Sequence, residues 1–496
     1  MRDFLITLDR GDKKSLQAQL REVLVSAILA GHLRASEKLP STRHLSRQLG
    51  ISRNTAVIVY QGLVEDGYLR TSERSGYFVN EIVQEMGIGA ARHMELDEER
   101  RLRPRQTVDW QVRLRVRPTA QRNIHKPLNW RQLPYPFIYG QPDPTLFPIS
   151  DWRDCAYRAM GRKWLDEWSQ DTQDNDDEML VDEIRSRILP RRGILAGEDQ
   201  ILVTLGAQQA IYMLASLLVS RSTEVALEEP GYPDARNIFA LRSETIRTID
   251  VDEQGLPVDE RLDGTQILYT TPSHQLPTTV TMPPQRRKAL LEKARQQDFL
   301  IVEDDYELEA NYVGDPLPAL KAHDSDGRVI YLGSFSKTLF PGLRLGFIVA
   351  DAELIKELRA LRRLMVRHPP VNNQRSTAFF LSLGFYDVFV RRLHRTYRER
   401  WTLMREALQA EFPDATVTHA MGGSSYWVDF AGGQLSDFDS ERLATLALEK
   451  GVLIEPGGIY SHQARSKSCA RLGFSSIATD RIEEGLARLR HVMDAN

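Results

Sequence analysis

Cysteine is almost absent from this chain, and long apolar runs are missing altogether. Two cysteines, Cys155 and Cys469, occur in 496 residues, which is too few for a disulfide framework and favours a reducing compartment. No stretch approaches the roughly 18 apolar residues of a membrane span, and the charged segment 1–10 does not have the pattern of a signal peptide. We therefore expect a cytoplasmic protein with no membrane contact.

Acidic residues are outnumbered by basic ones only in the first part of the chain. Residues 1–80 hold 12 Lys and Arg against 8 Asp and Glu, residues 81–132 hold 11 against 7, and the remainder holds 42 against 53. A basic head on an acidic body favours nucleic-acid contact at the head, although uneven solvated charge would give the same count. Length favours two or three units, and the charge distribution separates a head over 1–80, which would contact nucleic acid, and a basic linker over 81–132 from a body over 133–496.

The first 80 residues have the element order of a winged helix-turn-helix. An amphipathic pattern predicts a helix from Leu16 to Ala30, and a second short helix should end at Leu49 before the turn at Gly50. Ser52 is a suitable N-cap for a third helix that runs to about Asp66. Two short strands, 67–69 and 76–79, follow around a polar turn. Helices followed by a hairpin are typical of the winged helix-turn-helix.

Polar residues at the start of the third helix are expected to read DNA bases. Arg53 can pair with guanine and Asn54 with adenine in the major groove. A small helical domain with a solvated basic face is the alternative. The order Leu-Pro-Ser-x-Arg, Leu-Gly-x-Ser-Arg-x-Thr and Asp-Gly-Tyr-Leu within residues 39–79 resembles the GntR-type winged helix, which implies double-stranded promoter DNA as a partner. The other predicted DNA-binding residues are Arg43, Ser52, Thr55, Tyr60, Arg74 and Gly76.

Residues 81–132 show little periodicity and a strong positive charge. From Arg100 to Arg131 there are ten basic residues and one acidic residue, and prolines at 104, 118 and 127 interrupt any long helix. Such a segment is a linker that lies on another surface or on DNA, or it is a disordered tether.

From about Leu133 short apolar strands alternate with helical stretches. Short apolar runs between helices indicate a mostly parallel sheet buried on both faces. After about Tyr397 helices dominate, which predicts a smaller C-terminal subdomain. The expected strands are 201–205, 225–227, 245–246, 267–269, 299–302, 329–332 and 347–349.

Reactive side chains follow two of these strands, at the sheet edge where open parallel sheets bind ligands. Asp304 could face a protonated pyridine nitrogen, and Tyr306 could bond a ring phenolate. Lys337, once desolvated, could form an imine with an aldehyde. Taken alone, an acidic residue such as Asp304 is more often a helix cap. A lysine such as Lys337 is more often an ordinary surface residue. The ordered set favours an aldehyde cofactor held as a Schiff base.

A second group of residues is suited to an anion. Gly206, Ala207 and Gln208 end a strand and open a helix whose free amides can cradle a phosphate, although most such turns are structural. Ser334 and Ser336 can donate to the same phosphate. Arg344 could supply positive charge beside Lys337 or bind a carboxylate.

Residues from about 135 to 490 resemble the fold-type I aminotransferase module, and with the GntR-type head the whole chain resembles the MocR-type regulators. The resemblance implies a multidomain protein, with an α/β winged helix-turn-helix before an α/β aminotransferase-like domain. The motifs that carry it are Thr204-Leu205-Gly206-Ala207-Gln208-Gln209, Glu229-Pro230-Gly231-Tyr232-Pro233, Thr271-Pro272-Ser273-His274-Gln275, Glu303-Asp304-Asp305-Tyr306, Ser334-Phe335-Ser336-Lys337 and Ala470-Arg471-Leu472-Gly473-Phe474.

The family implies pyridoxal 5'-phosphate (PLP) as cofactor, bound to Lys337 as the internal aldimine with Asp304 at the pyridine nitrogen. It places Tyr306, His274 and Tyr232 near the ring, and it implies that Arg471 grips an effector carboxylate. Two positions depart from the usual pattern. Leu276 replaces an aromatic residue, and Thr279 stands where the family usually has glycine.

The resulting expectation is a sensor rather than an enzyme, with no dedicated catalytic residue and no metal site. A small amino-group effector, with a carboxylate or similar anion, would exchange onto PLP as an external aldimine and change promoter binding. The family implies a head-to-tail homodimer. Two alternatives stay open: a working aminotransferase with a vestigial head, and a direct sensor of PLP that controls vitamin B6 metabolism.

Overall fold

The computed structural model describes residues 8–12, 14–72, 76–81, 108–138, 140, 142–169, 175–418, 421–430 and 439–495. Arg74, predicted to contact DNA, and residues 82–107 of the predicted linker lie outside these residues. The chain divides into two compact units, residues 1–114 and 115–496, which are described separately. Their boundary falls inside the predicted linker.

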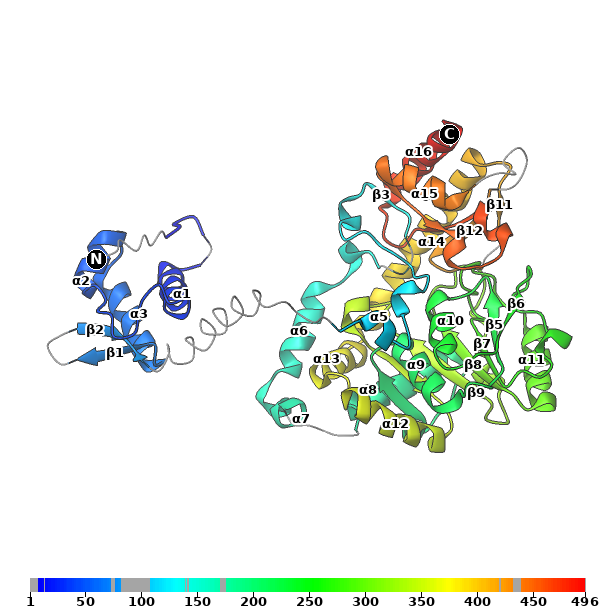
Figure 1. The fold of residues 1–496 in the computed structure, drawn as a ribbon, viewed down its shortest axis with the longest axis horizontal. Coiled ribbons are helices and arrows are strands. Elements are labelled where there is room, and N and C mark those ends of the chain that lie inside the picture. The colour runs from blue at the N-terminus through cyan, green and yellow to red at the C-terminus, as the bar shows by residue number, and fades with distance from the viewer. Residues whose placement is uncertain are drawn as a thin grey trace. The chain divides into compact units, whose positions relative to one another are not determined.

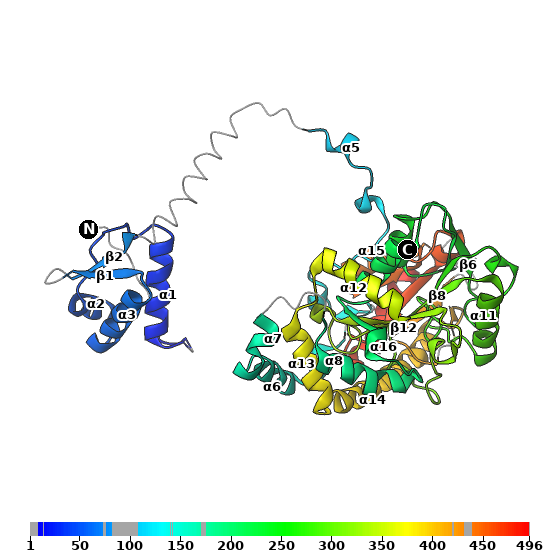
Figure 2. The same cartoon turned by 90° about the horizontal axis from the view of Figure 1, so that it is seen from below.

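The first unit has the predicted order of helices and hairpin (Figures 1 and 2). Serine hydroxyls cap three of its helices, because Ser15 Oγ accepts from Ala18 N, Ser41 Oγ from His44 N and Ser52 Oγ from Thr55 N. Gly50 ends the second helix at a φ of 64°. Helix α3 packs against both α1 and α2. The elements are α1 Leu16–Leu29, α2 Thr42–Leu49, α3 Arg53–Glu65, β1 Leu69–Ser72, β2 Gly76–Val79 and α5 Trp110–Arg113.

Tyr60 belongs to the core of this unit, which corrects its predicted role in DNA contact. Its side chain is fully buried, and its hydroxyl donates to Pro40 O at 3.0 Å. It lies on the same face of α3 as Ala56, Val59 and Leu63, all buried, so it packs inward. The other buried apolar residues of this core are Leu20, Leu24, Ile28, Leu39, Leu45, Leu69 and Val79.

The second unit contains the predicted mostly parallel sheet (Figure 1). The strand order is β4-β10-β9-β8-β7-β5-β6. Strands β5 to β9 run parallel to one another, and β10 is antiparallel to both β4 and β9. The bounds are β4 Ile201–Thr204, β5 Val225–Glu229, β6 Ile246–Asp250, β7 Ile267–Thr270, β8 Leu300–Asp305, β9 Val329–Ser334 and β10 Gly346–Val349.

Helices cover both faces of this sheet, so each strand side chain meets one of two apolar layers. Helices α9 (Ala207–Leu218), α10 (Pro233–Ala240) and α12 (Ala352–Val366) pack on the face that carries Val302. Helix α11 (Pro284–Gln297) packs on the face that carries Ile301. Because side chains alternate along a strand, Asp304 shares the face of Val302. Asp304 was predicted to lie after this strand. Strand β8 runs to Asp305, so Asp304 lies within the strand instead.

A smaller C-terminal subdomain is present, as predicted. It holds a four-stranded sheet in the order β11-β12-β15-β14, and a parallel pair of β3 with β13. Its strands are β11 Thr416–Val417, β12 Ser425–Asp429, β14 Glu455–Pro456, β15 Cys469–Gly473, β3 Tyr135–Pro136 and β13 Val452–Leu453. The remaining helices are α6 Ile149–Ala159, α7 Leu165–Ser169, α8 Glu178–Glu183, α13 Val371–Ser382, α14 Phe385–Glu411, α15 Ser440–Glu449 and α16 Ile482–Asp494.

In the part of the chain that is described, no helix is long and apolar enough to cross a membrane.

The last part of the predicted linker is packed on the second unit. Arg122 Nη1 donates to Gly458 O at 2.9 Å, and Asn237 Nδ2 donates to Arg122 O at 2.8 Å. Of the two alternatives for the linker, residues 121–126 therefore follow the first, a segment that lies on another surface.

Candidate cofactor and effector site

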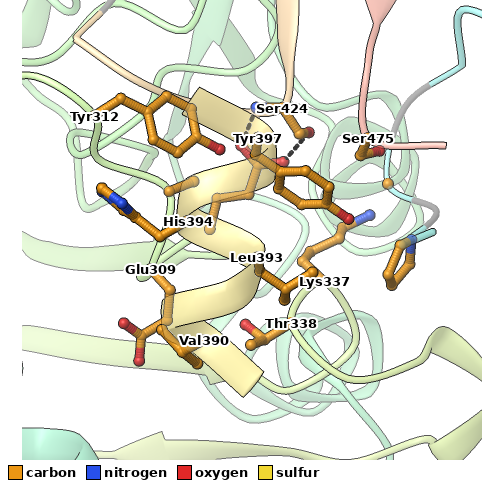
Figure 3. A pocket seen from close by; sticks show the side chains of 14 residues that line it. Glu309, Tyr312, Lys337, Thr338, Val390, Leu393, His394, Tyr397, Ser424 and Ser475 are labelled. Carbon is orange, nitrogen blue, oxygen red and sulfur yellow. Dashed lines mark hydrogen bonds between the residues drawn. The ribbon is translucent and has the colours of Figure 1, made fainter. Parts of the chain in front are cut away.

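Lys337 lies just beyond the end of β9, with its amine against Gly140. A Cβ built on Gly140 would lie 2.2 Å from Lys337 Nζ, and Gly140 has a φ of +71°. Glycine is therefore the residue that fits this position. Lys337 lines a cavity together with Thr338 and Tyr397 (Figure 3). The other described residues around it are Pro142, Glu307, Glu309, Ala310, Tyr312, Val390, Leu393, His394, Ser424 and Ser475.

The surroundings of Lys337 favour a neutral amine. Burial lowers its pKa from 10.5 to about 7, because desolvation disfavours the charged form. The positive charges of Lys126 and Arg471 contribute to this lowering, while Glu307 and Glu455 oppose it. At neutral pH a sizeable fraction of the amine is thus unprotonated, which is the form that attacks an aldehyde.

Asp304 presents a carboxylate oxygen that has no protein partner. The side chain is 3% exposed, and its Oδ2 accepts from the Tyr269 hydroxyl at 2.7 Å. Its Oδ1 is buried and has no hydrogen-bond partner among the described residues. Burial raises the pKa of Asp304 to about 6, and the Tyr269 hydrogen bond opposes this. A buried acceptor without a donor costs free energy, and a protonated ring nitrogen would satisfy it.

An anion cradle forms where β4 meets α9. Gly206 precedes the helix at a φ of 98°, without a side-chain cap, so the first amides of α9, including those of Ala207 and Gln208, keep their hydrogen-bonding capacity. The Arg344 guanidinium lies 3.5 Å from where a Gly206 Cβ would stand. Within the described residues the Arg344 side chain has no hydrogen bond or ion pair. The cradle combines a helix N-terminus with a cation, which suits a phosphate.

Other predicted cofactor residues make hydrogen bonds in the same region. Gln208 Nε2 and the Tyr232 hydroxyl both donate to Asp234 Oδ2, at 3.0 and 3.1 Å. Ser334 Oγ accepts from Ser336 N at 3.2 Å, which fixes the turn between β9 and Lys337.

Tyr306 and His274 lie in different surroundings, although they were predicted to share the ring oxygen. Tyr306 is 5% exposed and packs in an apolar cluster with Leu276, Trp427, Tyr460 and Cys469. His274 lines another cavity, with Arg192, Arg287 and Asp305. Asp305 points to the opposite face of β8 from Asp304. His274 therefore lies on the Asp305 side of β8, in a different cavity from Lys337.

Arg471 lies on β15 and is fully buried. Its Nε donates to Ser425 Oγ at 2.8 Å, and its Cζ lies 5.7 Å from the centre of the Tyr460 ring. The Tyr460 hydroxyl donates to Glu455 Oε2 at 2.7 Å, and Glu455 pairs in register with Arg471. A buried guanidinium whose charge reaches Lys337 is well placed for the carboxylate of a small amine.

Three functional residues were missed from the sequence: Tyr269, Gly140 and Lys126. Tyr269 is identified only by the register of β7 beside β8, Gly140 only by its contact with Lys337, and Lys126 only by the effect of its charge on the pKa of Lys337. The one local signal for any of the three was the run Tyr269-Thr270-Thr271 at the end of a predicted strand.

The described surface of the first unit offers unpaired polar side chains at the starts of α2 and α3. Arg43, Arg53 and Asn54 are exposed, and within the described residues their side chains make no hydrogen bond or ion pair. Ser52 and Thr55 instead shape the helix start, because their hydroxyls lie 2.8 Å apart. Gly76 opens β2 at a φ of +108°.

The residues of the second unit fit PLP. The unpartnered Asp304 Oδ1 suits a pyridinium nitrogen, the cradle at Gly206 and Arg344 suits the phosphate, and the Lys337 amine suits the aldehyde.

We expect Asp304→Asn to weaken PLP binding by about 1.5–3 kcal/mol, the range for a hydrogen bond to a charged group. The Asp304 pKa of about 6 means that the carboxylate is ionised above this pH and neutral below it. Wild-type affinity should therefore fall as pH drops through about 6, and the variant should lose this dependence. Equilibrium titration of cofactor-free protein measures both effects. The exposed Asp414→Asn serves as control, and a pH profile shared by all three proteins would contradict the assignment.

Comparison with known proteins gives two matches to families. Residues 180–489 match aminotransferases of class I and II, and residues 16–79 match bacterial regulatory proteins of the gntR family. The HTH-type transcriptional regulator TauR of Rhodobacter capsulatus is 40% identical over 484 residues, covering 97% of each chain. The probable rhizopine catabolism regulatory protein MocR of Rhizobium meliloti is 29% identical, covering 98% of this chain and 95% of its own. The kynurenine aminotransferase of Pyrococcus horikoshii is similar in structure, with a TM-score of 0.69 at 28% identity, covering 81% of this chain and 99% of that one.

Proposed function

The chain belongs to the MocR-type branch of the GntR family of bacterial regulators, and on that premise we propose that it is a transcription regulator that uses PLP to sense a small amine. One combination supports this most directly. The exposed Arg53 and Asn54 at the start of α3, unpaired within the described residues, occur in the same chain as a Lys337 amine with a pKa of about 7.

Each group of side chains has a distinct task in this proposal. Gly206 and Arg344 hold the phosphate, and Asp304 keeps the ring nitrogen protonated. Lys337 offers the amine, and Arg471 holds the anionic end of the effector. When bound, PLP supplies an aldehyde that condenses reversibly with a primary amine.

The effector can change promoter binding only if it binds two arrangements of the protein unequally. A coupling free energy of about 1–3 kcal/mol corresponds to a change of roughly 5–150-fold in DNA affinity. Two heads in a head-to-tail homodimer would read paired half-sites. Exposed apolar side chains on α6 and α12 support association of two copies, since Tyr157 is 78% and Leu364 83% exposed.

Promoter binding by the full-length protein tests the proposal. Fluorescence anisotropy with promoter DNA should show a change of at least about fivefold in affinity when PLP-loaded protein receives the cognate amine. Cofactor-free protein should not respond to that amine. The amines are offered as a panel of amino acids, each paired with the alkylamine of equal length.

The second candidate is a working aminotransferase. The pocket favours it, because Lys337, Asp304 and Arg471 together offer the chemistry that a transaminase requires. Repeated turnover with amino and keto acids, combined with an absence of promoter binding, would establish the enzyme and contradict the regulator. A response of promoter affinity to PLP alone, with no amine, would instead indicate the direct PLP sensor.

A further inference from the structure

The cavity that Lys337 lines is small and is formed by segments far apart in the sequence. Gly140, which lies against the Lys337 amine, is part of its wall. The segment after β8 contributes Tyr312, and α14 contributes Tyr397. The volume is about 40 Å³, which is room for about three water molecules. Because the wall includes Lys337 and Gly140, a group carried close to the reacting amine of an effector can enter this space.

Tyr312 presents a hydrogen-bond donor to this cavity. Its side chain is 5% exposed, and its hydroxyl is buried without a hydrogen-bond partner among the described residues. The backbone N of Tyr312 donates to Met421 O at 3.0 Å, and its ring packs edge-on against His394, with 5.4 Å between the ring centres. Figure 3 shows the hydroxyl pointing toward Ser424 and Tyr397. A buried donor without an acceptor costs free energy, and a ligand oxygen would supply the acceptor.

Glu307 presents an acceptor to the same cavity. Its Oε2 accepts from Ser424 N at 3.1 Å, and its Oε1 accepts from the Ser424 hydroxyl. An ionised carboxylate has about four acceptor positions, so Glu307 can take a further hydrogen bond. The second carboxylate of the wall, Glu309, is paired with Arg191 at 3.2 Å, whereas the hydrogen bonds to Glu307 come from an uncharged serine. An anionic ligand group would therefore meet a negative wall.

A hydroxyl is the group that satisfies both side chains. Tyr312 requires a ligand atom that accepts, and Glu307 requires one that donates. An ammonium group donates but cannot accept, and a carboxylate accepts but cannot donate. A hydroxyl does both with a single oxygen, which the volume of the cavity accommodates.

We propose that this cavity binds a hydroxyl group of the effector, with Tyr312 as its donor and Glu307 as its acceptor. The inference rests on the proposed function and narrows its ligand to small primary amines that carry a hydroxyl near the amino group. Tyr312 and Glu307 are then the residues that determine specificity. The role proposed for Arg471 toward an anion is separate.

The first test is the stability of full-length protein without effector. Tyr312→Phe removes a hydroxyl that has no partner among the described residues, so it should leave the melting temperature unchanged or raise it. Tyr157→Phe, on the exposed side of α6 at 78% exposure, is the matched control. A hydroxyl that is bonded within the protein would instead lower the melting temperature of Tyr312→Phe by about 2 °C or more.

The second test is binding of paired amines to the PLP-loaded protein, followed by the absorbance of the cofactor. The two members of each pair differ by a hydroxyl in place of a methyl group. The pairs are serine with 2-aminobutyrate, 1-amino-2-propanol with isobutylamine, and 4-amino-3-hydroxybutyrate with 4-amino-3-methylbutyrate. Wild type should prefer the hydroxyl member of at least one pair by about tenfold or more.

Tyr312→Phe should reduce that preference to less than about threefold through weaker binding of the hydroxyl member, and Tyr157→Phe should keep it. Glu307→Gln removes the negative charge of the wall. Wild type should bind serine better than aspartate, and this variant should lessen the discrimination about fivefold or more, because like charges no longer meet.

The inference is overturned if wild type binds both members of every pair equally, which would mean that the cavity holds water. It is also overturned if Tyr312→Phe keeps the hydroxyl preference, weakens both members alike or melts at a lower temperature. In each of these cases amines still bind, so the proposed function stands. If no amine changes the absorbance of the cofactor, the proposed function fails together with the inference.

Discussion

Lys337→Ala should abolish covalent binding of PLP and eliminate the effector response, from a change of roughly 5–150-fold in promoter affinity to none. The reason is local. Lys337 holds its amine against Gly140, and its pKa of about 7 leaves part of it neutral. Promoter affinity itself should stay within about threefold of the cofactor-free wild type. The first unit has its own core around Leu24, Tyr60 and Leu63 and does not depend on Lys337 to fold.

Absorbance of the bound cofactor and anisotropy with promoter DNA measure the two halves of this result on the same samples. The control is Lys288→Ala, which removes an exposed lysine from α11 and should change neither readout. A Lys337→Ala protein that still responds fully to the amine would contradict a sensor based on Schiff-base exchange. A variant that keeps its fold but binds no promoter at all would show that Lys337 is needed for the arrangement of the protein that binds DNA.

Local signals were sufficient to predict much of this structure. Ser52 caps the third helix, as its position predicted, because capping depends on a neighbour three residues away. The apolar runs became strands of a mostly parallel sheet, and Lys337 came just after the end of one of them. These features are determined over a few residues, so a single sequence contains them.

Tyr60 shows a signal that was present and not used. Ala56, Val59, Tyr60 and Leu63 recur at the spacing of one helical face, which argues for burial, and all four are buried. The polar hydroxyl suggested a DNA contact, but it is satisfied internally by Pro40 O. Periodicity was the better guide, because a tyrosine can bury its ring when its hydroxyl finds a partner.

The missed residues of the site depend on contacts between distant parts of the chain. The bond between Tyr269 and Asp304 requires β7 to lie beside β8 with a particular register. Lys126 precedes Lys337 by more than two hundred positions, and no periodicity connects them. Strand β8 also continued past Val302, so the alternation of its side chains decided that Asp304 and Asp305 face opposite layers. Local sequence cannot provide that information.

Arg53→Ala and Asn54→Ala should each weaken binding to the specific promoter by about 1–3 kcal/mol, with relaxed preference at one base position. Both side chains are exposed at the start of α3 and unpaired within the described residues, so their loss should not disturb the fold. Arg43→Ala should instead weaken binding to all sequences alike and reduce the salt dependence by about one unit of slope, as expected for a phosphate contact. Competition with scrambled DNA over a range of salt concentrations separates the two classes.

Two variants in the same unit serve as controls for the DNA readout. Arg21→Ala removes a charge of equal sign, but Arg21 is paired with Asp66 at 2.7 Å, beyond the C-terminal end of α3. It should leave the promoter preference unchanged. Tyr60→Phe removes the hydrogen bond to Pro40 O and should cost about 1 kcal/mol of folding free energy without altering the base preference. Should Arg53→Ala and Asn54→Ala behave like Arg21→Ala, the start of α3 would not be the reading element. The head would then contribute charge rather than sequence recognition to a regulator whose amine sensing lies in the other unit.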